Sequence, residues 1–469
     1  MKYVLILCAL LFSMNFTHAQ VFSVEKIKNA GDNDKRLNLV ILSEGYQSTE
    51  FDKFKTDAES LVSDMFTQSP FLEYAEYFNV HIIKVPSAQS GADHPGTAIG
   101  ESGITPVYKD TYFNATFDAF GYHRFLYYGL DYDDDDEAEI KIHAVLADNF
   151  PTYDQALILV NTDEYGGTGG EFPISSTGVS GNQIAIHELG HSLFDLKDEY
   201  IVPDVFYGEA INMTQENNTS LVKWKNWVDK NGINVYVYGT SGVSATWYRP
   251  HQACKMRYLG YPFCSVCKEG MVEKIHSLIS PIESYSPESS NISTPSFPLD
   301  FELGLIKTIP NTIESVWTLN HTNFANNVDN VSLTENDLNA GTNTLTTVVH
   351  DATTLVNIDN HDSTHIYTIT WTIENSSLGV NNITSKENNL SFTMFPTPSN
   401  GIINFKIDSD NNSSLKIDIL TIDGKKVKTI LIYNHSTQQV DISNLSNGLY
   451  IVNLYSDAIL VANKKLIKR

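Results

Sequence analysis

The segment His187-Glu188-Leu189-Gly190-His191 decides how the rest of the sequence is interpreted. Its two histidines are four residues apart, and the apolar residues around them recur at helical spacing: Ile184, Ile186, Leu189 and Leu193. Residues four apart share one face of a helix, so both imidazoles can reach one metal ion from the same side. The pattern therefore predicts a helix that carries two zinc ligands.

Glu188, next to the first histidine, suggests that the predicted metal site is catalytic. Zinc lowers the pKa of a water in its open coordination position, and a neighbouring carboxylate can take a proton from that water and deliver it to a leaving amine. The residues thus predict hydrolysis of peptide bonds with Glu188 as general base. Surface histidines on an ordinary helix are the alternative, which the apolar helical context and the acidic segment just downstream disfavour.

A catalytic zinc ion needs a third protein ligand. If the helix continued, Asp198 would lie about 10 Å beyond His191 along the axis, so the chain must turn back. Asp195 tolerates the left-handed conformation that such a turn requires. We expect Asp198 to complete a site for one zinc ion, with Glu199 as its rival. In a further alternative, both carboxylates only orient the histidines.

Charge and termini indicate where the protein works. The 469 residues carry a formal net charge of −25, which argues against nucleic acid and anionic lipid as partners. Lys2, the apolar run 4–16 and a small residue at Ala19 predict a signal peptide over residues 1–19. No later stretch is long and apolar enough to predict a membrane span. The acidic run Asp133–Asp136 is expected to be a solvated loop; calcium is possible there, but the usual ligand spacing is missing.

The cysteines predict a disulfide bond. Beyond the signal peptide the chain has Cys254, Cys264 and Cys267, which in an oxidising compartment suggest one disulfide and one odd thiol, with the pairing open. A zinc knuckle is the alternative, and it lacks an obvious fourth ligand.

The order of predicted elements divides the chain. Residues 37–42, 78–85 and 156–160 read as strands and residues 51–65 as a helix, which predicts an α+β domain over residues 20–280. A proline- and serine-rich linker is expected at 281–298. Short alternating runs then predict two β-sandwich-like modules, at 299–385 and 391–469.

Residues 187–200 resemble a known family. Their pattern is similar to the H-E-x-G-H-S and D-E-Y signature of the immunoglobulin A peptidase family of zinc metallopeptidases, which commonly has glycine in place of Phe194. Segments 160–170 and 90–95, and the cysteines from Cys254, resemble the same family. The resemblance covers about residues 35–275 and implies a zincin fold and endopeptidase activity.

Residues 254–258, Cys-Lys-Met-Arg-Tyr, are similar to the methionine turn of metzincins. The resemblance implies that Met256 packs beneath the zinc and that Tyr258 contacts the metal or stabilises the oxyanion; ordinary core packing is the alternative for both. The glycine-rich run Gly166–Gly170 is expected to form either a strand edge that pairs with substrate or a plain hairpin turn.

The C-terminal region resembles a sorting domain. Phe395-Pro396-Thr397-Pro398, Ile422-Asp423-Gly424-Lys425 and Asn447-Gly448-Leu449-Tyr450 occur in order, before a basic end at Lys464–Lys468. They resemble the C-terminal sorting domain of type IX secretion. This implies recognition by that machinery, then release or attachment at the cell surface. A plain adhesive β-module is the alternative.

Together these features predict a secreted zinc endopeptidase: an α+β zincin-like domain followed by two β-sandwich-like modules, acting on a protein or peptide substrate that the sequence does not identify. The competing class is a secreted adhesion or binding protein that keeps a zincin scaffold only for structure. The presence of Glu188 favours the enzyme, because a purely structural zinc would not need it.

Overall fold

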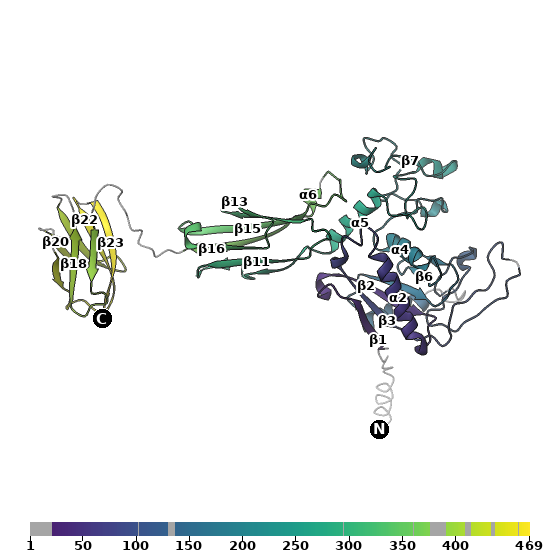
Figure 1. Ribbon diagram of the computed structural model, residues 1–469, viewed down its shortest axis with the longest axis horizontal. Coiled ribbons are helices and arrows are strands. Elements are labelled where there is room, and N and C mark those ends of the chain that lie inside the picture. The colour runs from purple at the N-terminus through teal and green to yellow at the C-terminus, as the bar shows by residue number, and fades with distance from the viewer. Residues whose placement is uncertain are drawn as a thin grey trace, which may run out of the picture. The chain divides into compact units, whose positions relative to one another are not determined.

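The computed structural model describes residues 21–469 apart from 102, 130–136, 294, 360, 376–390, 409–413, 433–436 and 458. The predicted signal peptide at 1–19 and the acidic run Asp133–Asp136 lie outside the described residues. The chain forms two compact units: the first contains the N-terminal domain and most of the β-module after it, and the second contains the C-terminal module (Figure 1). Among the described residues, no helix has the length and apolar character of a membrane span.

The N-terminal domain is built on a six-stranded sheet of order β1-β3-β2-β4-β6-β5. Strands β2, β3, β4 and β6 run parallel, while the edge strands β1 and β5 are antiparallel to their neighbours. The strands are β1 (Ser23–Lys28), β2 (Leu37–Glu44), β3 (Phe78–Lys84), β4 (Gln155–Val160), β5 (Gly167–Thr168) and β6 (Ile174–Ser176). They confirm the strands predicted near 37–42, 78–85 and 156–160.

Both faces of this sheet are buried. Leu39 and Ile41 of β2 belong to one hydrophobic cluster, whereas Val40 and Leu42 belong to a second. Alternate residues of a strand point to opposite faces, so the continuous apolar run at 37–42 places a core on each side of the sheet.

Helices supply the outer layers of the two cores. The first cluster includes residues of α2 (Phe51–Met65), α4 (Gly181–Ser192) and α5 (Ser265–Leu278), and the second includes residues of α3 (Glu137–Asn149). Figure 1 shows α2 and α4 next to each other against the sheet. A short ribbon of β7 (Tyr236–Val237) and β8 (Tyr248–Arg249) lies between α4 and α5 in the sequence. This part is the mixed α/β domain that the sequence predicts.

The next module consists of two sheets, of order β10-β16-β15-β12-β13 and β14-β11-β9. Burial alternates along its strands, and the indoles of Trp317 and Trp371 stack in its core at 5.9 Å. The strands are β9 (Ile282–Ser286), β10 (Asn291–Ile292), β11 (Leu299–Leu305), β12 (Ile313–Leu319), β13 (Thr322–Asn326), β14 (Asn330–Leu333), β15 (Gly341–Asp351) and β16 (Tyr367–Asn375), and a short helix, α6 (His361–Thr364), lies between β15 and β16 in the sequence.

The structure differs from the linker expected at 281–298. Strand β9 pairs along β11, and the Trp371 indole donates a hydrogen bond to the Pro287 carbonyl at 2.8 Å. Serine and proline suggested an exposed connection because their local propensities disfavour regular structure. Here the prolines lie outside the paired residues 282–286, so the segment supplies an edge strand of the sandwich, a position where proline nearby is tolerated.

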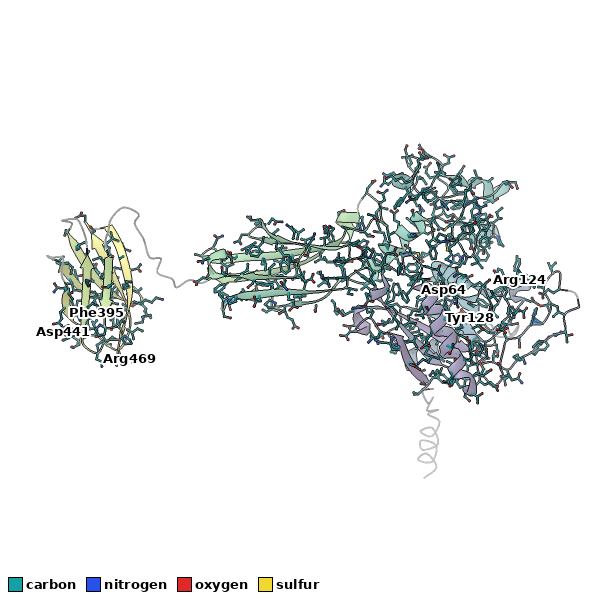
Figure 2. All side chains as sticks on the ribbon, viewed as in Figure 1. Asp64, Arg124, Tyr128, Phe395, Asp441 and Arg469 are labelled. Carbon is teal, nitrogen blue, oxygen red and sulfur yellow. The ribbon has the colours of Figure 1, made fainter. Side chains whose placement is uncertain are left out.

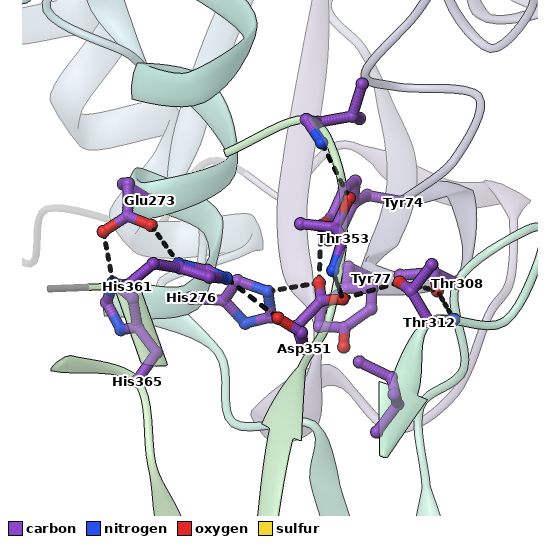
Figure 3. Close-up of polar contacts among 12 residues, drawn as sticks. Tyr74, Tyr77, Glu273, His276, Thr308, Thr312, Asp351, Thr353, His361 and His365 are labelled. Atoms are coloured by element: carbon purple, nitrogen blue, oxygen red, sulfur yellow. Dashed lines mark hydrogen bonds and ion pairs between the residues drawn. The ribbon is translucent and has the colours of Figure 1, made fainter. Parts of the chain in front are cut away.

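A buried polar network joins the sandwich to the N-terminal domain (Figure 3). At its centre is the Asp351 carboxylate, which accepts hydrogen bonds from Tyr74 at 2.5 Å and Thr312 at 2.6 Å and contacts His276 Nε2 at 2.8 Å. Nearby, Glu273 of α5 contacts His361 and His365 at 2.6 and 2.9 Å. Burial opposes ionisation of Asp351, but these hydrogen bonds dominate and lower its pKa.

The C-terminal module has a core of its own. Its two sheets, β17-β18-β21 and β20-β19-β22-β23, enclose a hydrophobic cluster drawn from residues 392–466. The strands are β17 (Ser391–Phe395), β18 (Ile402–Asp408), β19 (Leu415–Thr421), β20 (Lys426–Ile432), β21 (Gln438–Asp441), β22 (Gly448–Ser456) and β23 (Ile459–Lys468). Figure 2 labels Phe395, Asp441 and Arg469 on this module.

We expect the Asp351→Ala substitution to lower the free energy of unfolding by about 3 kcal/mol or more, because it leaves several buried donors without an acceptor. Asp329→Ala is the matched control: it removes an exposed ion pair with Lys307 and should cost less than about 1 kcal/mol. Urea unfolding of both variants measures the difference. Equal stabilities would show that the network does not hold the two parts together.

Candidate metal centre

Helix α4 presents the predicted ligands toward a common point. Its apolar residues, among them Ala185, Ile186 and Leu189, are buried in the core, which fixes the rotation of the helix. His187 and His191 lie one turn apart, and their Nε2 atoms are separated by 3.2 Å. The helix ends at Ser192, so the next ligand must come from the segment that follows.

The chain turns back directly after α4. Asp195 has a φ of 56°, and its backbone N–H donates to the His191 carbonyl at 3.0 Å. The turn at Asp195 confirms the predicted reversal and its left-handed residue. Phe194, where the resembled family commonly has glycine, is buried and packs edge-on against Phe71 at 5.7 Å.

The turn brings Asp198 to the histidines. Its Oδ1 atom lies 3.1 Å from His187 Nε2 and 3.3 Å from His191 Nε2. Ligand atoms bound to one tetrahedral zinc at about 2.0–2.1 Å are separated by about 3.3 Å. The triangle of two imidazole nitrogens and one carboxylate oxygen therefore fits three corners of such a site. Glu199, the rival third ligand, is fully buried elsewhere, with its Oε1 atom 3.4 Å from Cys267 Sγ.

The other ring nitrogen of each histidine is also held. His187 Nδ1 donates to the Lys255 carbonyl at 3.0 Å, and His191 Nδ1 donates to the Leu196 carbonyl at 2.7 Å. A backbone acceptor at Nδ1 selects the tautomer whose Nε2 lone pair is free for a metal. In the absence of an ion, burial lowers the pKa of His191, but the Asp198 carboxylate outweighs burial and raises it to about 9.

Glu188 is adjacent to this triangle without being part of it. One of its carboxylate oxygens lies within 4.8 Å of the ring nitrogens of His187 and His191. Gly169, just after β5, approaches it so closely that an added Cβ would be 2.9 Å from Glu188 Oε2. Burial raises the pKa of Glu188. A carboxylate so placed can hold a proton near the metal position.

Met256 packs against α4 at Gly190. It is fully buried, and a Cβ added at Gly190 would lie 2.8 Å from the Met256 sulfur. Gly190 therefore allows the methionine to pack against α4 between the two histidines.

Tyr258 lies on a cleft that also contains His187 and Glu188. Its side chain is 47% exposed, which sets it apart from a core residue. Arg124, labelled in Figure 2 in the long segment between β3 and α3, lines the same cleft. Tyr200 also lines this cleft, a position that the sequence did not predict. Its ring is 6.3 Å from that of His187, and its position in the D-E-Y signature was the available signal.

The predicted disulfide was wrong: Cys254, Cys264 and Cys267 are all free thiols. Cys254 Sγ and Cys267 Sγ are 3.6 Å apart, whereas a disulfide bond measures about 2.05 Å. Spacing along the chain could not show that Glu199 enters this cysteine cluster. Two further groups in the described chain also gather possible metal ligands: His94 with Glu101 and Asp118, and His143 with Glu139 and Glu171.

Comparisons with known proteins identify two regions. Residues 25–236 match the sequence profile of the IgA Peptidase M64 family, a range that includes His187, Glu188, His191 and Asp198 and ends before Cys254. Residues 393–469 match the secretion system C-terminal sorting domain. No curated protein sequence matches the chain.

Similar solved structures include latent PorU from Porphyromonas gingivalis (13% identity, 40% of this chain and 20% of PorU, TM-score 0.16). A β-glucuronidase from Faecalibacterium prausnitzii (10% identity, 34% of each chain, TM-score 0.15) is another. Fibronectin(III)-like modules of Clostridium thermocellum CbhA share 10% identity over 40% of this chain and 93% of theirs, with a TM-score of 0.14. The chain thus spans at most about a third of the first two proteins.

By these two profile matches, residues 25–236 of the chain are similar to the IgA Peptidase M64 family, and residues 393–469 are similar to the secretion system C-terminal sorting domain.

Proposed function

We propose that the N-terminal domain is a zincin-type, zinc-dependent endopeptidase in which His187, His191 and Asp198 hold the ion. The observation that carries the proposal is the triangle of their ligand atoms, with sides of 3.1, 3.2 and 3.3 Å. Two histidines and a carboxylate with one open position are typical of catalytic zinc, whereas structural sites are closed by four protein ligands. The match to a peptidase family supports the same reaction class.

Zinc bound there would acidify a water in the open position and polarise the scissile carbonyl. Glu188 would accept one proton from the attacking water and return it to the amide nitrogen as the C–N bond breaks. The products are a carboxylic acid and an amine, and Glu188 regains its starting state. The raised pKa of Glu188 suits a group that must hold this proton between the two steps.

Further cleft residues would bind the substrate. Tyr258 is exposed at the cleft, which fits the role of a hydrogen-bond donor to the developing oxyanion. Strand β5, from the glycine-rich run, forms one edge of the sheet. Gly169, the residue just after β5, lies against the Glu188 carboxylate. The free edge of β5 can pair with an extended peptide backbone.

The sorting domain makes the protein secreted or displayed at the cell surface. We therefore place the proposed peptidase outside the cell, acting on protein substrates after transport by the type IX machinery. The alternative, an adhesion protein with a zincin scaffold retained for structure, does not account for a Glu188 carboxylate held beside an otherwise open ligand triangle.

The Glu188→Gln substitution should retain zinc but lower kcat/KM by about 100-fold or more, because the general base is lost while the ligands remain. Glu59→Gln, on the exposed face of α2, is the control and should leave both unchanged. A quenched-fluorescent peptide library and elemental analysis give the two readouts. Full activity in Glu188→Gln would exclude the mechanism.

Asp198→Asn should weaken zinc binding at the histidines by roughly tenfold or more, since it removes a charged ligand. Asp195→Asn makes the same chemical change three residues earlier, at an exposed position that tolerates a positive φ, and should bind zinc normally. Competition with a fluorescent chelator measures both affinities. If the two variants bind zinc equally well, Asp198 is not a ligand.

Deletion of residues 391–469 should trap the protein in the periplasm of its native host without abolishing hydrolysis, because the core of the C-terminal module is drawn from its own residues. Fractionation and a peptide assay of the purified truncate test the two parts separately. Normal export of the truncated protein would show that the C-terminal module is not the secretion signal. Loss of hydrolysis in a folded truncate would place part of the active site within it.

A further inference from the structure

The three free cysteines and Glu199 form a second cluster of metal-ligating side chains. Glu199 follows the turn after α4, Cys254 precedes Met256 by two residues, and Cys264 and Cys267 flank the start of α5. One ligand atom from each lies within 4.8 Å of all the others, and all four residues are buried. The cluster is separate from the histidine triangle, because it uses none of its residues.

The distances within the cluster fit a tetrahedral ion. Cys254 Sγ is 3.6 Å from Cys267 Sγ, and Cys267 Sγ is 3.4 Å from Glu199 Oε1. Ligand atoms on one tetrahedral zinc, with Zn–S of about 2.3 Å and Zn–O of about 2.0–2.2 Å, are separated by about 3.6–3.8 Å. The two measured separations are close to these edges and far from a covalent S–S bond.

Polar groups around the cluster orient its members. The Cys264 backbone N–H donates to Cys254 Sγ at 3.3 Å, and Asn212 Nδ2 donates to Glu199 Oε1 at 3.2 Å. Such donors commonly support metal-bound thiolates and carboxylates. Glu199 Oε2, by contrast, is buried with no hydrogen-bond partner. A buried carboxylate oxygen without a donor is costly unless a cation compensates it.

We propose that Glu199, Cys254, Cys264 and Cys267 bind a second zinc ion with a structural role. Four protein ligands leave no open position, as in structural zinc sites, and three thiolates select a soft or borderline metal over Ca²⁺ or Mg²⁺. Binding releases the thiol protons to solvent and changes no oxidation state. The buried Arg249, which interacts electrostatically with Glu199, offsets part of the negative charge of the ligand set.

This ion would connect the parts that build the catalytic centre. Glu199 is the neighbour of Asp198, and its backbone N–H donates to the Met256 carbonyl at 2.7 Å. The Cys254 carbonyl accepts hydrogen bonds from the backbone N–H groups of Arg257 and Tyr258 at 2.9 Å, and Cys267 belongs to α5. The effect on Asp198 rests on the proposed function, whereas the second metal site itself does not.

The experiment uses the full chain, purified without chelators, in a His187→Ala/His191→Ala background that removes the first site. We expect about one zinc ion per chain to remain in this background. Adding Cys264→Ser or Glu199→Gln should reduce the zinc content to less than a fifth of that. Glu269→Gln, another fully buried carboxylate of the same domain, is the matched control and should retain the ion.

Cobalt substitution gives a readout independent of activity. Cobalt-loaded protein with intact cysteines should show thiolate-to-cobalt charge-transfer absorption in the histidine-deficient background, and Cys264→Ser should lose it. If the cysteine variant does not fold, the spectrum of the folded histidine-deficient protein still decides the question.

Two results would overturn the proposal. After denaturation in chelator, alkylation should label Cys254, Cys264 and Cys267, so labelling of only one of these three would show that the other two form a disulfide. Three reactive thiols in a folded, histidine-deficient protein that holds neither zinc nor cobalt would also refute it. Persistent hydrolysis by the histidine-deficient protein would instead refute the proposed function and leave the second site standing.

Discussion

The reversal of the chain after α4 is the constraint on which the site depends. Asp198 is seven residues beyond His191, yet its Oδ1 atom is 3.3 Å from the His191 ring. This return requires a left-handed residue at Asp195, whose φ is 56°, and two backbone hydrogen bonds that close the end of the helix. Asn212 then holds both the N–H and the carbonyl of Lys197, which fixes the residue before Asp198. The ligand triangle follows from backbone geometry rather than from side-chain attraction alone.

Asp198 and Glu199 show how adjacent carboxylates acquire different roles. One faces the histidines and the other faces the cysteines, because neighbouring side chains of a non-helical segment point in different directions. Their environments differ accordingly. The histidines lower the pKa of Asp198 against the effect of burial, whereas burial raises the pKa of Glu199 well above its ordinary value. Asp198 and Glu199, which the sequence offered as alternatives for one ligand position, therefore lie in two different clusters.

The sequence predicted the features that local patterns control. The buried strands, helix α2, the ligand helix and the turn at Asp195 follow from hydrophobic periodicity and backbone preferences, and the structure contains them. Features that depend on distant contacts were missed. The segment at 281–298 looked like a linker because nothing local reveals its pairing with β11. The disulfide was wrong because Glu199, more than 50 residues before Cys254, joins the cysteines only in the folded chain.

Helix α5 connects the cysteine cluster to the β-sandwich module. Its first turn contributes Cys267 to the cysteine cluster, while its last turn places His276 against Asp351 of β15. Between them, Glu269 accepts a hydrogen bond from the Asn357 backbone at 2.6 Å. One helix therefore contacts the support of the Asp198 segment at one end and the sandwich along the rest of its length. The sandwich is part of the structural support of the proposed active site, and a boundary drawn at residue 280 would cut through that support.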